Sequence, residues 1–146
     1  MVNYICMDRE RIDGFRAGME GKQADFLEIP QKKEERDIFY IQNFSKILQC
    51  TAVFAVSDFY AAELVYKLQE QGLNVPNDMS VIGFDDSFWC KRIYPSLATI
   101  KQDKKERAKI AVEILIEMKQ GIYNRTSVIL PANLVIRSSV RKIGGL

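Results

Sequence analysis

Apolar residues recur along this chain in two different patterns, and each pattern predicts one kind of element. Short continuous apolar runs indicate buried strands, whereas apolar residues spaced by three and four indicate amphipathic helices. We therefore expect helices over residues 9–20, 37–49, 59–71 and 104–120. The expected strands are Val2–Met7, Asp25–Ile29, Thr51–Val56, Met79–Phe84, Leu97–Ile100, Ser127–Leu130 and Asn133–Arg137.

Strands and helices alternate through the first hundred residues, and Gly21, Gly72 and Gly121 stand where three of the helices should stop. Alternation of this kind predicts an α/β protein with a parallel sheet and helices on both of its faces. A chain of 146 residues is long enough to form one domain with its own core.

Polar side chains follow the predicted strands at the carboxyl edge of this sheet, where ligands bind in open α/β folds. Carboxylates accept hydrogen bonds from vicinal hydroxyl groups, and a guanidinium donates in a planar fork, so these groups suit a sugar or another polyol. Phe84, Phe88 or Trp89 would offer an apolar face for a sugar ring. The candidate polar ligands are Arg11, Ser57, Asp58, Asp85 and Gln102.

Simpler explanations exist for the same residues. Asp8 and Asp58 each precede a helix, where Asp is a favoured N-cap. The pair Asp85-Asp86 fits a solvated turn, and Arg11 fits the wet face of a helix. Phe88 and Trp89 fit a core or a subunit interface as well as a ligand platform.

Composition narrows the function further. The chain contains no histidine, which excludes catalytic triads, histidine metal ligands and histidine pH switches. A net charge of +2 gives no strong attraction to nucleic acid, and no apolar run is long enough to cross a membrane. Three scattered cysteines indicate reduced thiols in a cytoplasmic protein. We expect neither a metal nor a cofactor, and no catalysis.

Several stretches together resemble the effector-binding domain of lactose-repressor/galactose-repressor (LacI/GalR) regulators, and also the sensor domains of arabinose-repressor-type proteins. The resemblance runs in the family's order over nearly the whole chain. Its segments are R-I-D-G-F at 11–15, A-V-F-A-V-S-D at 52–58, G-L-N-V-P-N-D-M-S-V-I-G-F-D-D-S at 72–87, P-S-L-A-T-I-K-Q at 95–102 and L-V-I-R-S-S-V at 134–140.

The resemblance implies a periplasmic-binding-protein-like type I fold, in which two subdomains close on a small effector and alter the DNA affinity of an attached domain. Arg11, Ser57 and Asp85 match ligand-contacting positions of the family, Asp58 borders the cleft, and Gln102 falls at a crossover. Ser57 stands where the family often has asparagine, so the identity of the effector does not carry over. The effector is expected to be a sugar or related polyol.

This chain shows no match to a helix-turn-helix or to the first subdomain, so we expect a fragment of a longer, homodimeric regulator that reaches operator DNA through another domain. Residues 1–103 would form the flavodoxin-like, doubly wound subdomain with strand order 2-1-3-4-5. Residues 104–126 would be a crossover helix without an intrachain partner, which packs on another copy or is mobile. Residues 127–146 would be returning strands and a tail.

Two other functions remain open. A secreted or periplasmic solute-binding protein would share the fold, although the G-F-D-D and L-A-T-I-K-Q motifs favour the regulators. A phosphoacceptor domain would use Asp8, Asp58 and Lys101, but Arg9 stands where such a site needs a second acid.

Overall fold

A mixed four-stranded sheet is the centre of the computed structural model, which describes residues 6–19, 21, 24–122 and 127–142. The strands lie in the order β1-β2-β3-β4. β1 pairs with β2 and β2 with β3 in parallel, and β4 pairs with β3 in antiparallel. The strands are β1 (Ala52–Phe54), β2 (Ser80–Phe84), β3 (Ala98–Gln102) and β4 (Ala132–Val135).

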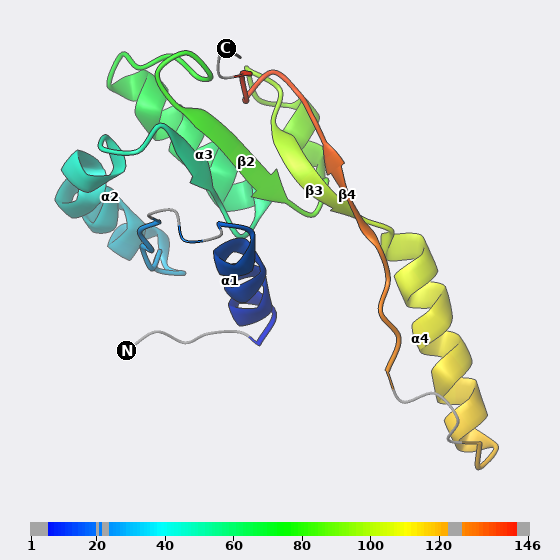
Figure 1. Cartoon of the computed structure of the whole chain (residues 1–146). Helices are drawn as coiled ribbons and strands as arrows, with labels where there is room; N and C mark the ends of the chain where they lie inside the picture. The colour runs from blue at the N-terminus through cyan, green and yellow to red at the C-terminus, as the bar shows by residue number, and fades with distance from the viewer. Residues whose placement is uncertain (1–5, 20, 22–23, 123–126, 143–146) are drawn as a thin grey trace.

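Four α-helices and one short 3₁₀ helix surround or extend this sheet (Figure 1). The three helices predicted within the first hundred residues and the one after them are all confirmed, with shifts of a few residues at their ends. The helices are α1 (Cys6–Gly18), α2 (Lys33–Ile47), α3 (Asp58–Glu70), η1 (Phe88–Lys91) and α4 (Lys104–Lys119).

Helix α3 covers one face of the sheet and supplies most of the core. Its predicted stripe of Ala61, Leu64, Val65 and Leu68 is buried. The helix ends at the predicted glycine, since Gly72 has φ of 77° and Leu73 donates its N–H to the Leu68 carbonyl at 3.0 Å. A glycine after the last turn tolerates this left-handed backbone without steric cost.

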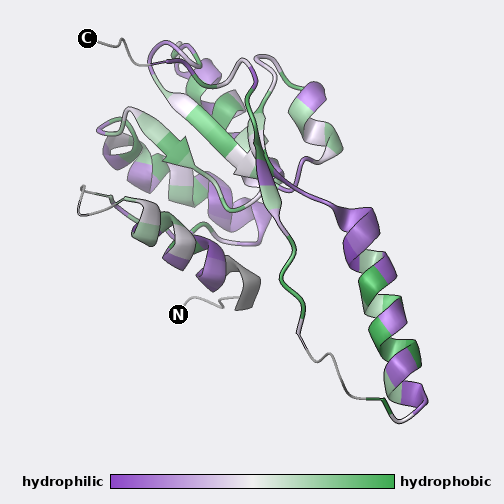
Figure 2. Cartoon of the chain, turned by 45° about the vertical axis from the view of Figure 1, so that its right-hand side comes forward, coloured by the Kyte–Doolittle hydropathy of each residue, from purple (hydrophilic) through white to green (hydrophobic). Residues whose placement is uncertain are grey.

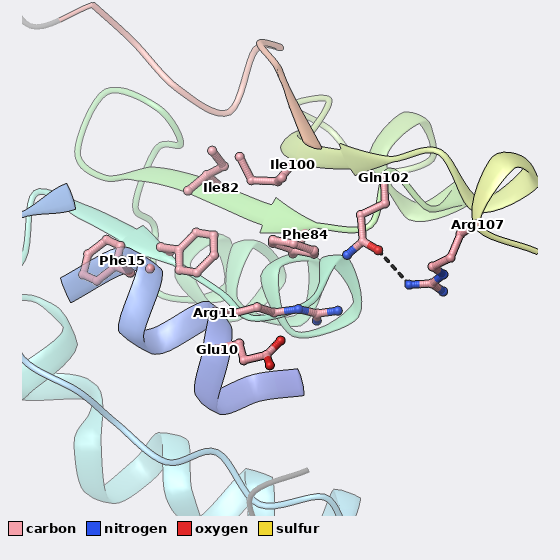
Figure 3. A pocket seen from close by; sticks show the side chains of 10 residues that line it. Glu10, Arg11, Phe15, Ile82, Phe84, Ile100, Gln102 and Arg107 are labelled. Atoms are coloured by element: carbon pink, nitrogen blue, oxygen red, sulfur yellow. Dashed lines mark hydrogen bonds between the residues drawn. The ribbon is translucent and has the colours of Figure 1, made fainter. Parts of the chain in front are cut away.

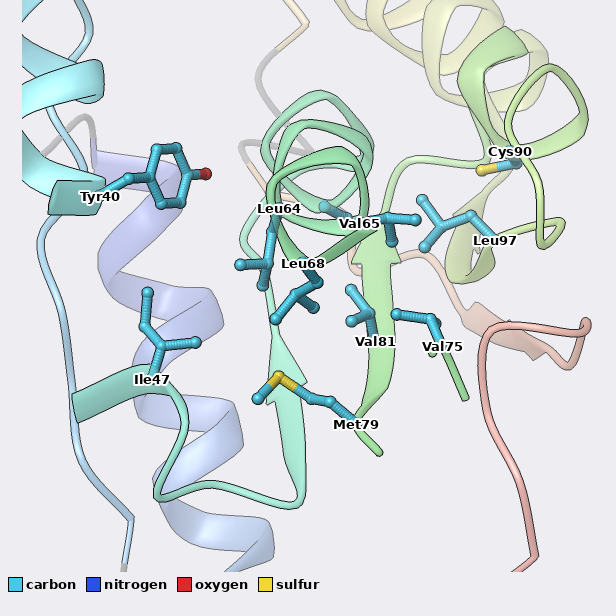
Figure 4. Close-up of a cluster of buried hydrophobic side chains, with 11 residues drawn as sticks. Tyr40, Ile47, Leu64, Val65, Leu68, Val75, Met79, Val81, Cys90 and Leu97 are labelled. Carbon is cyan, nitrogen blue, oxygen red and sulfur yellow. The ribbon is translucent and has the colours of Figure 1, made fainter. Parts of the chain in front are cut away.

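The hydrophobic core lies between α3, the near face of β2 and the segments that enter β2 and β3 (Figure 4). Val65, Leu68, Val81 and Leu97 are at most 1% exposed. Full burial of one such side chain contributes about 1.5–3 kcal/mol relative to exposure. The core therefore fixes β2 and the residues that follow it.

The opposite face of the sheet carries a second set of side chains. Successive residues of a strand point to opposite faces, so Ile82 and Phe84 face away from the core that contains Val81. On that side, Phe15 of α1 stacks on Phe54 of β1 with ring centroids 5.5 Å apart. Helices thus lie on both faces of the sheet, as the sequence predicted.

Part of the predicted strand pattern is wrong. Residues 25–29 form no strand. Their side chains pack in place: Leu27 and Ile29 pack against the core, and Phe26 contacts Phe15 edge to face. Of the predicted strand Val2–Met7, residues 2–5 lie outside the described residues, and α1 begins at Cys6.

The predicted order 2-1-3-4-5 is therefore observed only for its last three strands, β1, β2 and β3. Residues 127–130 are not a strand either. The last predicted strand forms as β4, slightly shorter than expected, and its antiparallel pairing makes the sheet mixed instead of wholly parallel. β4 runs antiparallel because the chain re-enters the sheet at the end where β3 leaves it, so that Gln102 pairs with Ala132.

Helix α4 projects away from the sheet in both views, and Figure 2 shows hydrophobic and hydrophilic turns side by side along it. Asp103 caps its first turn by accepting a hydrogen bond from the Glu106 N–H at 2.9 Å. None of its residues is buried. Its exposed apolar side chains are Val112, Leu115, Ile116 and Met118. The expectation that this helix packs on another copy of the chain stays a prediction.

Candidate functional site

A pocket of about 690 Å³ lies between α1 and the face of the sheet opposite α3 (Figure 3). Its size is within the usual range for sites that bind small molecules. Apolar side chains from α1 and three strands form its floor, namely Phe15, Phe54, Ile82, Phe84 and Ile100. Polar side chains stand at its rim, namely Glu10, Arg11, Gln102 and Arg107.

Arg11 joins α1 to the carboxyl ends of two strands. Its Nη1 donates to the Val56 carbonyl at 2.5 Å, and its Nη2 lies 3.4 Å from Asp85 Oδ1. The guanidinium carbon lies 4.1 Å from the centre of the Phe84 ring. A guanidinium held by a carbonyl, a carboxylate and an aromatic face is fixed in orientation before any ligand arrives.

Asp85 and Asp86 form the turn that ends β2, and both have a positive φ, 107° and 47°. Such values are uncommon outside glycine, although Asp is among the residues that adopt them. The Asp85 N–H donates to the Ile100 carbonyl at 2.8 Å, and the Asp86 N–H donates to Thr99 Oγ1 at 3.3 Å. Both acids thus belong to one tightly bonded turn, and the Asp85 carboxylate is 30% exposed.

Asp58 is buried in the interior of the protein and does not line the pocket. It is 1% exposed, and its carboxylate accepts hydrogen bonds from Thr99 Oγ1 at 2.5 Å and from the Ser87 N–H at 2.6 Å. Burial, together with a hydrogen bond to Asp58, raises the pKa of the adjacent Cys90 thiol to about 12. A phosphoacceptor must meet its phosphate donor, so the buried position of Asp58 gives that alternative no support.

Ser57 is the N-cap of α3, where its hydroxyl accepts a hydrogen bond from the Tyr60 N–H at 3.4 Å. It does not line the pocket beside Arg11. Gln102 does line the pocket, and its Oε1 accepts a hydrogen bond from Arg107 Nη1 at 2.7 Å (Figure 3). Of the five predicted polar ligands, Arg11 and Gln102 line the pocket, and Asp85 lies beside it through its contact with Arg11. Ser57 and Asp58 lie in the supporting structure, and the ligand role of all five stays a prediction.

Phe88 and Trp89 lie on η1, away from the pocket lining. Their ring centroids are 4.6 Å apart, and Trp89 contacts Phe59 of α3 edge to face at 6.2 Å. Phe88 is 62% exposed. Neither residue lines the pocket beside Arg11, and their place in a subunit interface stays a prediction.

Several site residues were missed in the sequence. The floor residues Phe54, Ile82 and Ile100 were interpreted only as core, although their positions in the strands place them on one face of the sheet. Phe15 was interpreted only as part of the apolar stripe of its helix. Arg107 gave no signal beyond that of a charged residue on a helix. Arg137, which binds Asp86 at 2.6 Å, stood inside a quoted motif but gave no separate signal.

Within the described ranges, no group of three or more His, Cys, Asp or Glu residues is arranged to hold a metal ion. In the same ranges, no helix is long and apolar enough to span a membrane. Hydrogen-bonding and aromatic groups dominate the pocket.

Comparison with known proteins extends these observations. Residues 4–140 match the family of periplasmic binding protein-like domains. The HTH-type transcriptional regulator MalR of Clostridium butyricum is 32% identical over 143 residues, which cover 94% of this chain and 43% of the relative. The HTH-type transcriptional repressor PurR of Aliivibrio salmonicida is 34% identical over 143 residues, which cover 92% and 42%.

Solved structures of LacI-type regulators are similar to this chain as well. A periplasmic binding protein/LacI transcriptional regulator from Alkaliphilus metalliredigens, complexed with D-xylulofuranose, superposes with a TM-score of 0.81 at 28% identity, over 92% of this chain and 52% of that one. The lac repressor dimer bound to operator and the anti-inducer ONPF gives a TM-score of 0.78 at 27% identity, over 90% and 47%.

The chain therefore belongs to the periplasmic binding protein-like domain family, in the form that LacI-type transcriptional regulators carry. This confirms the family and the α/β fold class expected from the sequence. The chain spans less than half the length of the two curated relatives. Those relatives are named as regulators and not as enzymes.

Proposed function

We propose that this chain is a ligand-sensing part of a LacI/GalR-like transcriptional regulator, and that the pocket beside Arg11 is one wall of its effector site. The observation that carries the proposal is the Arg11–Asp85 pair, 3.4 Å apart, above the Phe84 ring. Similarity to regulators along nearly the whole chain supports it.

The chemistry of the pocket suits a sugar or a related polyol. Asp85 offers acceptor oxygens for ring hydroxyls, while Arg11 and Gln102 offer donors. The aromatic floor suits the apolar face of a sugar ring. The relative from Alkaliphilus metalliredigens, whose structure contains D-xylulofuranose, is consistent with this class of ligand.

In the whole regulator, effector binding would close this wall on a second one and so alter the affinity for operator DNA. Closure of two domains around a ligand is a common switching movement. We propose a cytoplasmic homodimer as the working form, with Phe88 and Trp89 at or near its interface. Asp85→Ala in the whole regulator is expected to weaken the response to the effector while folding is retained.

The proposal is tested by following the backbone amide NMR signals of the chain during titration with D-xylulose, D-ribose, maltose, cellobiose and, for comparison, adenine. One wall supplies only part of the contacts, so we expect dissociation constants of about 1 mM or weaker, equivalent to about −4 kcal/mol. At least one sugar should shift signals clustered at Arg11, Asp85 and Gln102. The proposal fails if no sugar does so, or if the shifts fall elsewhere.

A further inference from the structure

The Asp85–Asp86 turn is held by a residue from the far end of the chain. Arg137 Nη2 lies 2.6 Å from Asp86 Oδ1, and the two side chains are 13% and 19% exposed. The same guanidinium donates through Nη1 to the Leu97 carbonyl at 2.8 Å. One planar group thus ties the turn after β2 to the residue that leads into β3.

Arg137 itself stands on a firmly attached segment. Two residues later, Ser139 is fully buried between β2 and β3. Its hydroxyl donates to the Val81 carbonyl at 2.6 Å and accepts from the Ala98 N–H at 2.8 Å. The segment therefore presents the guanidinium from a fixed position, two residues after β4 ends.

The turn needs such an anchor because two successive non-glycine residues adopt positive φ in it. Conformations of this kind are strained and persist only where surrounding contacts enforce them. Backbone hydrogen bonds restrain the turn through Thr99 and Asp58. Arg137 binds the Asp86 carboxylate and so restrains the side chain of this turn.

We propose that Arg137 is a positioning residue for the effector site: it binds Asp86 and thereby keeps the Asp85 carboxylate directed toward Arg11. It would set ligand affinity without touching the ligand. Because Arg137 follows β4, which returns from the α4 region, the same ion pair would link the state of the pocket to the segment that leaves the sheet. The link to affinity rests on the proposed function, whereas the link to the turn does not.

The test compares Arg137→Met and Arg137→Lys with the unaltered chain by NMR, without any ligand. A residue with positive φ gives a strong nuclear Overhauser cross-peak between its own amide and α protons, because this conformation brings the two protons close together. The cross-peaks of Asp85 and Asp86 therefore report the conformation of the turn directly. We expect these two cross-peaks to weaken in Arg137→Met and to return, at least in part, in Arg137→Lys. Arg141→Met is the control, since Arg141 is exposed and only its backbone contacts Ser80.

Asp86→Asn provides a second variant of nearly the same size, should Arg137→Met not fold. It should weaken the Asp85 cross-peak as Arg137→Met does, while the amide signals of β1 and α3 keep their positions. Retention of the positive-φ cross-peaks in every folded variant would overturn the proposal. Since no sugar is present, that result is distinct from failure of the sugar titration.

Discussion

Thr99 donates its hydroxyl hydrogen to Asp58 at 2.5 Å, and both residues are almost completely removed from solvent. The same hydroxyl oxygen accepts the Asp86 N–H at 3.3 Å. Thr99 therefore connects the start of α3 to the turn that carries the site, and it satisfies a carboxylate that would otherwise be buried with one donor fewer.

Thr99→Val keeps the shape of the side chain and removes this hydroxyl. Loss of one partner of a buried polar group costs about 1–3 kcal/mol, more for a charged group. We expect a decrease of this size in the free energy of unfolding by urea. Thr99→Ser keeps the hydroxyl and should lose less. Equal stability of the Val variant and the unaltered chain would contradict this role.

Gly83 is required by the close approach of α3 to β2. A Cβ at this position would lie 2.4 Å from Asp58 Oδ1 and 3.0 Å from its Cα, so backbone atoms would have to move. Gly83→Ala is expected to destabilise the chain by about 1–3 kcal/mol, as overpacking does.

Gly14→Ala is the matched control, because nothing lies within 4 Å of its added Cβ in α1. An alanine inside a helix is favoured over glycine by about 0.5–1 kcal/mol. The two substitutions should thus change the urea midpoint in opposite directions. A destabilised Gly14→Ala chain together with a neutral Gly83→Ala chain would refute the described packing.

Two buried groups that lose a proton at high pH, the Cys90 thiol and the Tyr40 hydroxyl, predict a loss of stability there. Burial raises the pKa of Cys90 from 9.0 to about 12, and it also raises the pKa of Tyr40 above its ordinary 10.0, with the Glu63 charge acting in the same direction. The folded state therefore holds these protons more tightly than the unfolded state does. Their contribution is complete below about pH 9 and declines as pH rises above it.

We expect the urea midpoint to be steady from pH 7 to pH 8 and to fall between about pH 9 and pH 11. Tyr40→Phe removes one of the two groups, so its midpoint should fall less steeply over the same interval. A midpoint that rises with pH in this interval would show that the two groups are not buried as described.

The apolar side chains of α4 predict self-association of the chain. Leu115 is 65% and Ile116 is 52% exposed, and Val112 and Met118 of the same helix are exposed as well. Exposed apolar clusters favour association. The double variant Leu115→Glu/Ile116→Glu should sediment as a smaller species than the unaltered chain at high concentration, with a change in unfolding free energy within about 0.5 kcal/mol.

Gln120→Glu adds a negative charge at the C-cap of the same helix without removing apolar surface, and it should sediment like the unaltered chain. An unaltered chain that stays monomeric at every concentration, with α4 ordered and exposed, would contradict the expectation.

The sequence predicted the helices and the inner strands well because their signals are local. The stripe of α3 and its glycine stop needed no distant partner, and the apolar runs at β2 and β3 were continuous. The segment 25–29 was misjudged because pairing with a neighbouring strand, which no local pattern reports, decides whether an extended run becomes a strand.

For the site, the structure places Arg11 of α1 beside Asp85, which follows β2, and Gln102 of β3 lines the same pocket as Arg11. Their role as ligand contacts stays a prediction. The sequence pattern did not distinguish the acidic residue beside the pocket, Asp85, from the buried one, Asp58. Asp58 lies in the interior because Gly83 allows α3 to approach β2 closely, a contact between segments 25 positions apart. The role of Arg137 required the fold, because its partner Asp86 is 51 positions away.

The most direct test of the sensor assignment is to compare Asp85→Asn with the unaltered chain in the sugar titration. The substitution removes the charge at nearly constant size, and Asp37→Asn, which alters an exposed acid beside Lys67, is the control. We predict that the sugar giving the clearest signal changes at Arg11 and Gln102 will bind Asp85→Asn at least about tenfold more weakly, a loss of about 1.4 kcal/mol. Asp37→Asn should match the unaltered chain. Equal sugar affinity in the unaltered and Asp85→Asn chains would contradict the assignment of this pocket.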